Sequence, residues 1–265
     1  MDIFNIQSSE LFELRLLLIM ILRFLEDVND KNHRPHDVFR CVIAPFEREV
    51  IAKINSRHEG ETIRSLHYTK LSPHLPEFYG IYQKYILMED LTQGYSSPCR
   101  FDFKIGTRTW DINASDKFKN KLRKKNLKSS SQLYGVRLVS CEMMKKNETI
   151  ENSTKSENLS LSYSQIYEKI QKYVDPQLRN LIAEKLNSLS LAYSEVLKEH
   201  PNMRVYSGSV LVCFDGDDPK LTPKVKFIDF AHFHFDITKE GFDPNDHSLD
   251  DNVLYGIKHL INLFK

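Results

Sequence analysis

Two short segments of the chain combine ionisable side chains with strongly apolar neighbours. In residues 98–106, alternation along a strand would place Asp102 and Lys104 on one face and the aromatic side chains on the other. In residues 227–232, Asp229 follows an apolar run, and a buried Asp is costly unless it is paired or binds a metal. An Asp at the end of a buried strand is a recurrent metal ligand in phosphoryl transfer. The alternatives are an ordinary solvated strand for the first segment and a turn cap for the second.

A third segment, residues 117–128, carries seven Lys or Arg residues and no acidic residue. Helical surfaces normally mix both charges in i,i+4 pairs, so a helix of one sign repels itself unless an anion is near. The ordinary explanation is a solvated charged face. A nucleic acid is a second explanation, but aromatic side chains for base stacking are almost absent from the segment. A compact polyanionic small molecule fits this short segment at least as well.

The whole chain has 265 residues, with 37 Lys and Arg against 36 Asp and Glu and a net charge of +1. This composition excludes disorder throughout and a histone-like polycation, and the length suits one large domain or two lobes. Any anion must therefore be held by a local patch. The chain has four cysteines, far apart in sequence, which disfavours a zinc site and indicates a reduced, intracellular protein.

Hydrophobic periodicity predicts the elements that position these residues. Helices are predicted at residues 9–27, 46–55, 116–128, 163–173, 176–200 and 252–264. Strands are predicted at residues 38–43, 78–82, 85–88, 101–105, 135–139, 206–214 and 225–230. Residues 145–162 are polar and predict a mobile insertion. A polar break at residues 89–92 separates a mixed first part from a larger α+β part, which favours two lobes with a ligand cleft between them.

The charged segments together resemble those of the inositol polyphosphate kinases. Residues 98–106 match the family signature PxxxDxKxG at Pro98, Asp102, Lys104 and Gly106. Residues 206–211 resemble the family's serine-rich strand, and residues 228–232 resemble its IDFAH segment. Residues 250–260 resemble its closing helix. The resemblance runs in order from residue 78 to residue 264.

The resemblance implies an α+β fold with two lobes, like that of protein kinases (SAICAR-synthase-like), and an ATP cleft between the lobes. Residues 1–90 would form a divergent N-lobe and hinge, and residues 91–265 the C-lobe. The C-lobe would include an inositol-phosphate-binding helical segment at about residues 113–128 and the polar insertion at about residues 145–162.

The resemblance also implies roles in binding ATP and Mg²⁺. The backbone of Glu89 and Leu91 would bind adenine, and Asp102 would contact the ribose hydroxyls. Ser209 and Asp229 would lie at the nucleotide phosphates and the metal, with Asp229 as the main metal ligand and a catalytic residue.

The implied substrate is an inositol polyphosphate, and Lys104 would bridge it to the transferred phosphoryl group as a second catalytic residue. In the basic segment, the lysines expected to bind substrate phosphates are Lys117, Lys121 and Lys124. Phosphoryl transfer depends on charge neutralisation and in-line positioning, which these residue types supply.

The N-terminal part departs from the family pattern. Ala44 stands where the family has an ATP-binding lysine, although Pro45 and the pair Arg48-Glu49 follow as expected, and no glycine precedes Gly60. Another cation such as Lys53 could replace the lysine, activity could be weak, or the gene start could be misassigned. Residues 11–25 are largely apolar, yet shorter than the ~20 residues of a membrane span, and predict a buried or capping helix rather than a peripheral anchor.

Three functions follow from this sequence. The favoured one is an ATP-dependent inositol phosphate kinase, a phosphotransferase of inositol phosphate biosynthesis. The alternative is a catalytically impaired scaffold or sensor that binds inositol phosphates, and an RNA-binding protein that uses residues 117–128 ranks third. We expect a monomer in the cytoplasm or nucleus, with no membrane span and no specific nucleic-acid partner.

Overall fold

The computed structural model describes residues 38–43, 48–218 and 221–265, so the predicted helix at residues 9–27 and Ala44 lie outside the described residues. The chain divides into two compact units. The small unit takes in residues up to Ser56 and Glu77–Gln93, and the large unit consists of Arg57–Pro76 and Gly94–Lys265. Residues 57–76 therefore group with the large unit, whereas the predicted boundary after residue 90 assigns them to the N-lobe.

The small unit contains a four-stranded antiparallel sheet in the order β1-β2-β4-β3. Its strands are β1 (Val38–Ile43), β2 (Arg48–Ile54), β3 (Phe78–Tyr82) and β4 (Tyr85–Glu89). The helix predicted at residues 46–55 is wrong, because residues 48–54 form β2. Val50 and Ala52, two residues apart on the strand, both point into the core. Pairing on both sides of β2 outweighs the helical spacing of the apolar residues.

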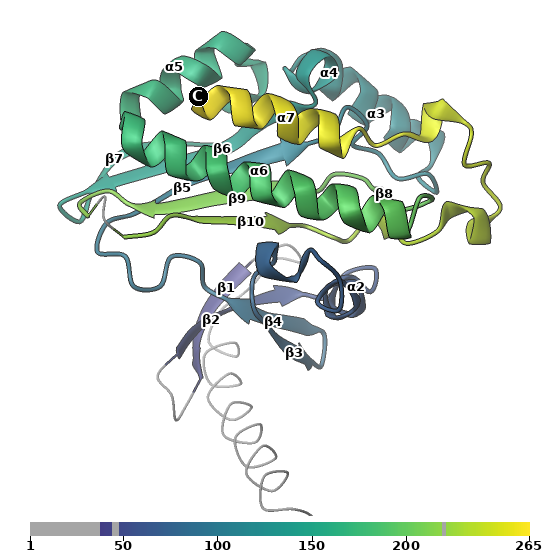
Figure 1. Cartoon of the computed structure of the whole chain (residues 1–265), viewed down its shortest axis with the longest axis horizontal. Helices are drawn as coiled ribbons and strands as arrows, with labels where there is room; N and C mark the ends of the chain where they lie inside the picture. The colour runs from purple at the N-terminus through teal and green to yellow at the C-terminus, as the bar shows by residue number, and fades with distance from the viewer. Residues whose placement is uncertain (1–37, 44–47, 219–220) are drawn as a thin grey trace, which may run out of the picture. The chain divides into compact units, whose positions relative to one another are not determined.

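The large unit is built on a five-stranded antiparallel sheet with helices packed above it in Figure 1. The sheet order is β10-β9-β5-β6-β7. The strands are β5 (Pro98–Ile105), β6 (Val136–Lys145), β7 (Glu148–Ser153), β9 (Ser209–Asp215) and β10 (Lys224–Ile228), and a separate pair joins β8 (Arg204–Val205) to β11 (Phe233–His234). The helices are α2 (Glu59–Leu66), α3 (Asp116–Leu127), α4 (Ser131–Tyr134), α5 (Tyr163–Tyr173), α6 (Pro176–Glu199) and α7 (Val253–Phe264). Short 3₁₀ helices occupy Ser72–His74, Asn158–Ser160, Ile237–Glu240 and His247–Leu249.

The aromatic face of β5 forms the centre of the large core. Phe101 and Phe103 stack at 5.7 Å, and Phe264 of α7 meets both rings edge-on at 6.4 and 6.0 Å. Because alternate strand residues point to opposite sides, this packing leaves Asp102 and Lys104 on the face of β5 away from α7. The predicted separation of charged and aromatic faces is confirmed.

The polar segment at residues 145–162 is ordered, so its prediction as a mobile insertion is wrong. It contains β7, which pairs with β6 through a tight turn at Lys146 and Asn147, both in the left-handed region with φ of 51° and 59°. Such turns match the twist of a hairpin. Beyond β7, the buried side chain of Asn158 donates hydrogen bonds to the carbonyls of Val139 and Ser153, both at 3.2 Å.

No helix of the described residues is both long enough and apolar enough to cross a membrane.

Three glycines join the end of β5 to the C-terminal helix. The amide of Gly106 donates to the carbonyl of Gly135 at 2.8 Å, and a Cβ on Gly256 would lie 2.1 Å from that same carbonyl oxygen. The backbones at Gly135 and Gly256 can approach this closely because both positions lack a side chain, and a Cβ on Gly106 would lie 2.5 Å from the Asp251 carbonyl oxygen. The junction fixes the end of β5 two residues beyond Lys104.

We predict that Gly256→Ala lowers the free energy of unfolding by about 1–3 kcal/mol, because the added methyl group must displace the Gly135 carbonyl. On an ordinary helix surface the same change would stabilise the protein. Urea denaturation measures the effect, with Asn262→Ala on the exposed side of α7 as the control. A stabilised Gly256→Ala variant would contradict the packing described.

Candidate active site

Three neighbouring strands bring Lys104, Ser209 and Asp229 together. Lys104 pairs in register with Ser209, which pairs with Ile228, and Asp229 follows Ile228 directly. The Lys104 Nζ lies 3.0 Å from the Asp229 Oδ2 and donates to the Ser207 carbonyl at 2.7 Å. The Ser209 hydroxyl lies 3.4 Å from the same Asp229 oxygen. The structure thus places an ammonium, a hydroxyl and a carboxylate in one contact group.

The backbone at Asp229 adopts an uncommon conformation that α2 helps to hold. Its φ of 67° lies in the left-handed region, which non-glycine residues occupy mainly where surrounding contacts impose it. The amide of Phe230 donates to the Oε1 of Glu59 at 2.8 Å, and Glu59 is buried in the first turn of α2. Neither α2 nor Glu59 was predicted from the sequence, because the only local signal is an acidic residue in a polar segment.

We predict that Glu59→Ala lowers the free energy of unfolding by about 1–3 kcal/mol, because the buried Phe230 amide loses its acceptor. Glu59→Gln retains a carbonyl oxygen at the same place and should recover most of the loss. Guanidinium denaturation of both variants measures this difference. Equal destabilisation by the two substitutions would show that the acceptor at Phe230 is not what Glu59 contributes.

Asp102 lies two residues before Lys104 on the same face of β5. Burial raises the pKa of its carboxyl group, while the Lys104 ammonium opposes this rise. Its Oδ1 is buried and has no hydrogen-bond partner in the described part of the chain. A buried acceptor without a donor is costly, so this oxygen is suited to a donor supplied by a ligand, such as a hydroxyl.

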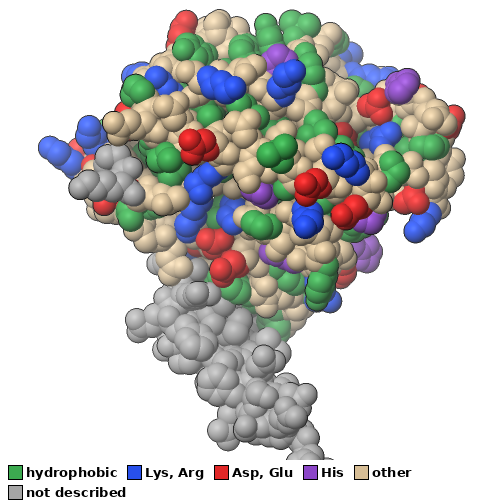
Figure 2. Space-filling view, in the orientation of Figure 1, with side chains coloured by type: hydrophobic (Ala, Val, Ile, Leu, Met, Phe, Trp, Pro, Cys, Tyr) green, Lys and Arg blue, Asp and Glu red, His purple; other side chains and the backbone are tan. Residues whose placement is uncertain are grey.

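A second group of cations adjoins Lys104. Burial, together with the nearby charges of Arg137, Lys155 and Lys104, lowers the pKa of Lys125 on α3 to about 8. These four cations come from four different parts of the chain: α3, β6, the segment after β7, and β5. Figure 2 shows basic and acidic side chains interspersed over the displayed face. Four converging cations repel one another and favour a bound polyanion.

Buried hydrogen bonds fix the position of this cationic group. Arg137 is buried and donates to the Ser131 hydroxyl at 2.9 Å, and burial lowers the pKa of its guanidinium to about 10. Asn126, the neighbour of Lys125, donates to the Thr107 carbonyl at 2.7 Å and accepts from the Thr109 hydroxyl at 3.0 Å. The loop after β5 is thereby tied to α3, so Lys125 is held near Lys104.

The structure distinguishes among the lysines of α3. The predicted substrate lysines Lys117, Lys121 and Lys124 are exposed. Lys121 lies one turn before Lys125 on the same helical face, whereas Lys124 is displaced from it by about 100° around the helix. Lys125, Arg137 and Lys155 were not predicted as site residues, because adjacent lysines in a one-sign run look alike in sequence.

The hinge residues predicted to bind adenine belong to the small unit. Glu89 ends β4, and its amide donates to the Glu77 carbonyl at 2.9 Å. Leu91 is buried. Between them, the Asp90 carboxylate accepts from the Thr92 amide at 2.9 Å and pairs with Arg40 at 2.7 Å. The backbone of this segment is therefore held by the Glu89 amide and by the Asp90 carboxylate, which lies between the two predicted adenine-binding residues.

The oxygen donors of Asp229 and Ser209 fit a divalent cation that carries a nucleotide. No group of three or more His, Cys, Asp or Glu side chains among the described residues could hold a metal ion by itself. Mg²⁺ typically takes one or two protein oxygens and completes its shell with phosphate oxygens and water. The donor set therefore fits Mg²⁺ bound together with ATP.

A pair of histidines, His232 and His234, follows Asp229 in the chain. The Asp111 Oδ2 accepts from His232 Nδ1 at 2.8 Å and from His234 Nε2 at 3.2 Å, and His234 Nδ1 lies 2.5 Å from Glu240. Burial alone would lower the pKa of His234, but the hydrogen bonds to Asp111 and Glu240 raise it. Both ring nitrogens face carboxylates, and only an imidazolium can donate from both.

We predict that His234 stabilises the fold most at acidic pH. Its folded pKa lies above the ordinary value of 6.5, so this contribution is complete below pH 6.5 and is lost as pH rises through the folded pKa. The stability difference between wild type and His234→Gln should therefore shrink between about pH 5.5, roughly one unit below the ordinary pKa, and about pH 9, roughly two and a half units above it. Denaturant titrations with His247→Gln, an exposed histidine, serve as the matched control.

Comparison with solved structures identifies the fold of the chain. The solved structure of inositol phosphate multikinase Ipk2 from Saccharomyces cerevisiae, in complex with ADP and Mn²⁺, superposes with a TM-score of 0.65 at 19% identity, covering 81% of this chain and 97% of that one. A second inositol phosphate multikinase structure gives a TM-score of 0.57 at 21% identity, covering 79% and 94%. The expected two-lobed, kinase-like fold is confirmed.

The family model for inositol polyphosphate kinase matches residues 85–265. The chain belongs to this family, as the sequence motifs predicted. Inositol hexakisphosphate kinase 3 of Mus musculus is 26% identical over 223 residues, covering 75% of this chain and 54% of the relative. Inositol hexakisphosphate kinase 1 of Saccharomyces cerevisiae is 26% identical over 260 residues, covering 89% and 23%. The chain thus spans about half or less of the length of these relatives.

Proposed function

We propose that the chain is an ATP-dependent kinase that transfers the γ-phosphoryl group to an inositol polyphosphate, from trisphosphate to hexakisphosphate. The position of Lys104 supports this most. It contacts Asp229 on one side and lies close enough to Lys125 on the other to lower the pKa of that ammonium. One lysine thus adjoins both a group suited to a metal–nucleotide and a group suited to a polyanionic acceptor.

Each residue has a chemical role in this proposal. Asp229 and Ser209 hold the metal, which is Mg²⁺ in our proposal and neutralises charge on the nucleotide phosphates when bound. Lys104 stabilises charge on the transferred group. Asp102 offers its buried oxygen to the ribose hydroxyls, and the backbone of Glu89 and Leu91 remains the proposed adenine contact.

The substrate contacts of the proposal centre on Lys125, Arg137 and Lys155, with Lys121 on the same face of α3. Lys117 and Lys124 remain proposed as outer contacts at the exposed surface. We further propose a monomer without a specific nucleic-acid partner, acting in the cytoplasm or nucleus. The thiols of Cys99, Cys141 and Cys213 are free and buried, which agrees with a reducing compartment.

We predict transfer of radiolabel from [γ-³²P]ATP to inositol trisphosphate or hexakisphosphate, lost in Asp229→Asn. Lys125→Gln should raise the KM for the inositol phosphate by about tenfold or more with little change in the KM for ATP, because it removes a charge-assisted contact to substrate alone. Lys239→Gln, an exposed substitution, controls for general charge effects.

The outcomes separate the kinase from its alternative. Thermal stabilisation by inositol hexakisphosphate without any transfer from ATP would replace the enzyme with a binding scaffold. Equal rises of both KM values in Lys125→Gln would contradict the assignment of Lys125 to the substrate.

Lys53 lies in β2, and its substitution by Met tests whether this lysine takes over the role of the lysine missing at Ala44.

A further inference from the structure

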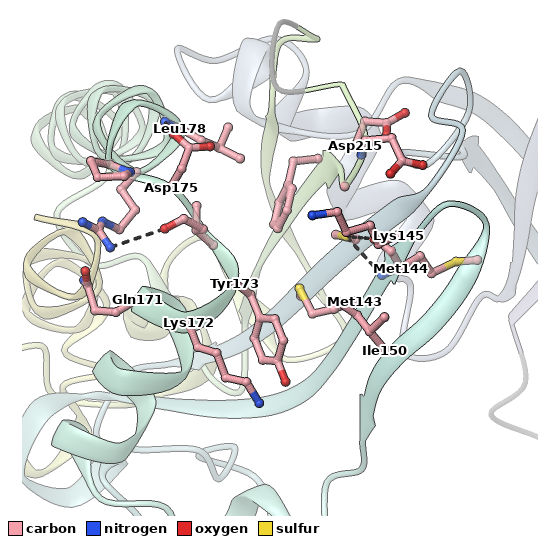
Figure 3. Close-up of a pocket in the computed structure, with 17 residues that line it drawn as sticks. Met143, Met144, Lys145, Ile150, Gln171, Lys172, Tyr173, Asp175, Leu178 and Asp215 are labelled. Carbon is pink, nitrogen blue, oxygen red and sulfur yellow. Dashed lines mark hydrogen bonds between the residues drawn. The ribbon is translucent and has the colours of Figure 1, made fainter.

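A cavity of about 650 Å³ lies at the far end of the large sheet from Lys104. Lys104 is near the end of β5 and Ser209 at the start of β9, whereas the cavity is lined by Cys99 at the start of β5 and Phe214 near the end of β9. Its remaining walls come from β6, β7 and the junction between α5 and α6 (Figure 3). All of these elements belong to the large unit.

The inner wall of the cavity is apolar. Met143 of β6, Phe214 of β9 and the pair Val174 and Leu178 at the α5–α6 junction are all buried and line it. The volume falls within the range of small-molecule sites in proteins. This wall is suited to the apolar portion of a ligand.

The carboxylates around the cavity already accept hydrogen bonds from the chain. Asp175 caps α6 by accepting from the Leu178 amide at 3.0 Å. Asp215 accepts from the amides of Ser96 and Asp217, at 2.5 and 2.8 Å. Asp217 accepts from the Lys146 amide at 2.8 Å. The acceptors of the lining are therefore engaged by backbone donors.

Two donors of the lining, on Gln171 and Arg179, retain hydrogen-bonding capacity. The Nε2 of Gln171 is buried and has no hydrogen-bond partner within the described residues. Arg179 uses one of its five N–H groups, for the Val174 carbonyl at 3.3 Å. In Figure 3, Lys145 extends from β6 toward the middle of the cavity, and Lys172 comes from α5. A ligand for this cavity must supply acceptor oxygens.

We propose that this cavity is a second ligand site, separate from the phosphoryl-transfer group, for a small amphipathic anion. Its apolar portion would pack on Met143, Phe214 and Leu178, and its anionic oxygens would accept from Gln171, Arg179 and Lys145. An acceptor at Gln171 satisfies a buried donor that otherwise goes unpaired. The proposal does not depend on the kinase activity.

The test uses octyl phosphate as probe, with octyltrimethylammonium and 1-octanol as cationic and neutral probes of equal chain length. In full-length protein carrying ¹³C-methyl methionine, octyl phosphate should shift the signals of Met143 and Met144, which line the cavity, and leave Met88 and Met203 unmoved. The other two probes should bind at least tenfold more weakly, because neither supplies an anion to the donors.

Two substitutions locate the binding. Gln171→Leu removes the buried donor with little change of volume, and Lys145→Glu reverses a charge at the cavity. Each should weaken the binding of octyl phosphate by about tenfold or more. The matched changes Gln177→Leu and Lys198→Glu, both at exposed positions of α6, should leave this binding unchanged. The proposal is overturned if Met143 and Met144 do not respond, if they respond equally to the cationic probe, or if the cavity variants bind like their controls.

Discussion

The contact between Lys104 and Asp229 is the constraint around which the large unit is organised. It exists only if β5, β9 and β10 keep their register, since a slip of one residue turns each side chain to the opposite face. The stacked rings of Phe101 and Phe103 against α7 resist such a slip, because it would bury charge and expose aromatic surface. The glycine junction at the end of β5 and Glu59 at the Asp229 turn fix the two ends of this contact.

The positive charge that matters for this contact group is concentrated near Lys104 and is not a property of the whole surface. With 37 basic and 36 acidic residues, the chain has almost no net charge, so long-range steering is weak. The positive potential that can attract an anion is local instead. It arises where Lys125, Arg137, Lys155 and Lys104 lie near one another, although like charges repel. The lowered pKa of Lys125, about 8, reflects burial together with that repulsion. An anion bound there would relieve the repulsion, which is why we propose these residues as the contact for a polyanionic substrate.

The sequence predicted those features that depend on local pattern. The period of apolar residues located α5, α6 and α7, and strand alternation separated Asp102 and Lys104 from the aromatic face. It did not predict β2, whose apolar spacing suits a helix as well as a strand until neighbouring strands pair with it. Nor could it separate Lys125 from Lys124. That distinction depends on the rotation of α3, which is set by the buried Asn126 and its bonds to Thr107 and Thr109.

The two ligand sites that we propose lie at opposite ends of the large sheet. β5 runs from one to the other, with Cys99 at the cavity and Lys104 at the contact group, and it is hydrogen-bonded along its length to β6 and β9. A ligand at one end could move the other end along β5 only by breaking pairing on both sides. Coupling between sites requires an element with two arrangements of similar energy, and a central strand paired on both sides is not such an element. Binding in the cavity should therefore leave the contact between Lys104 and Asp229 undisturbed, and any influence of one site on the other must pass through the helices above the sheet.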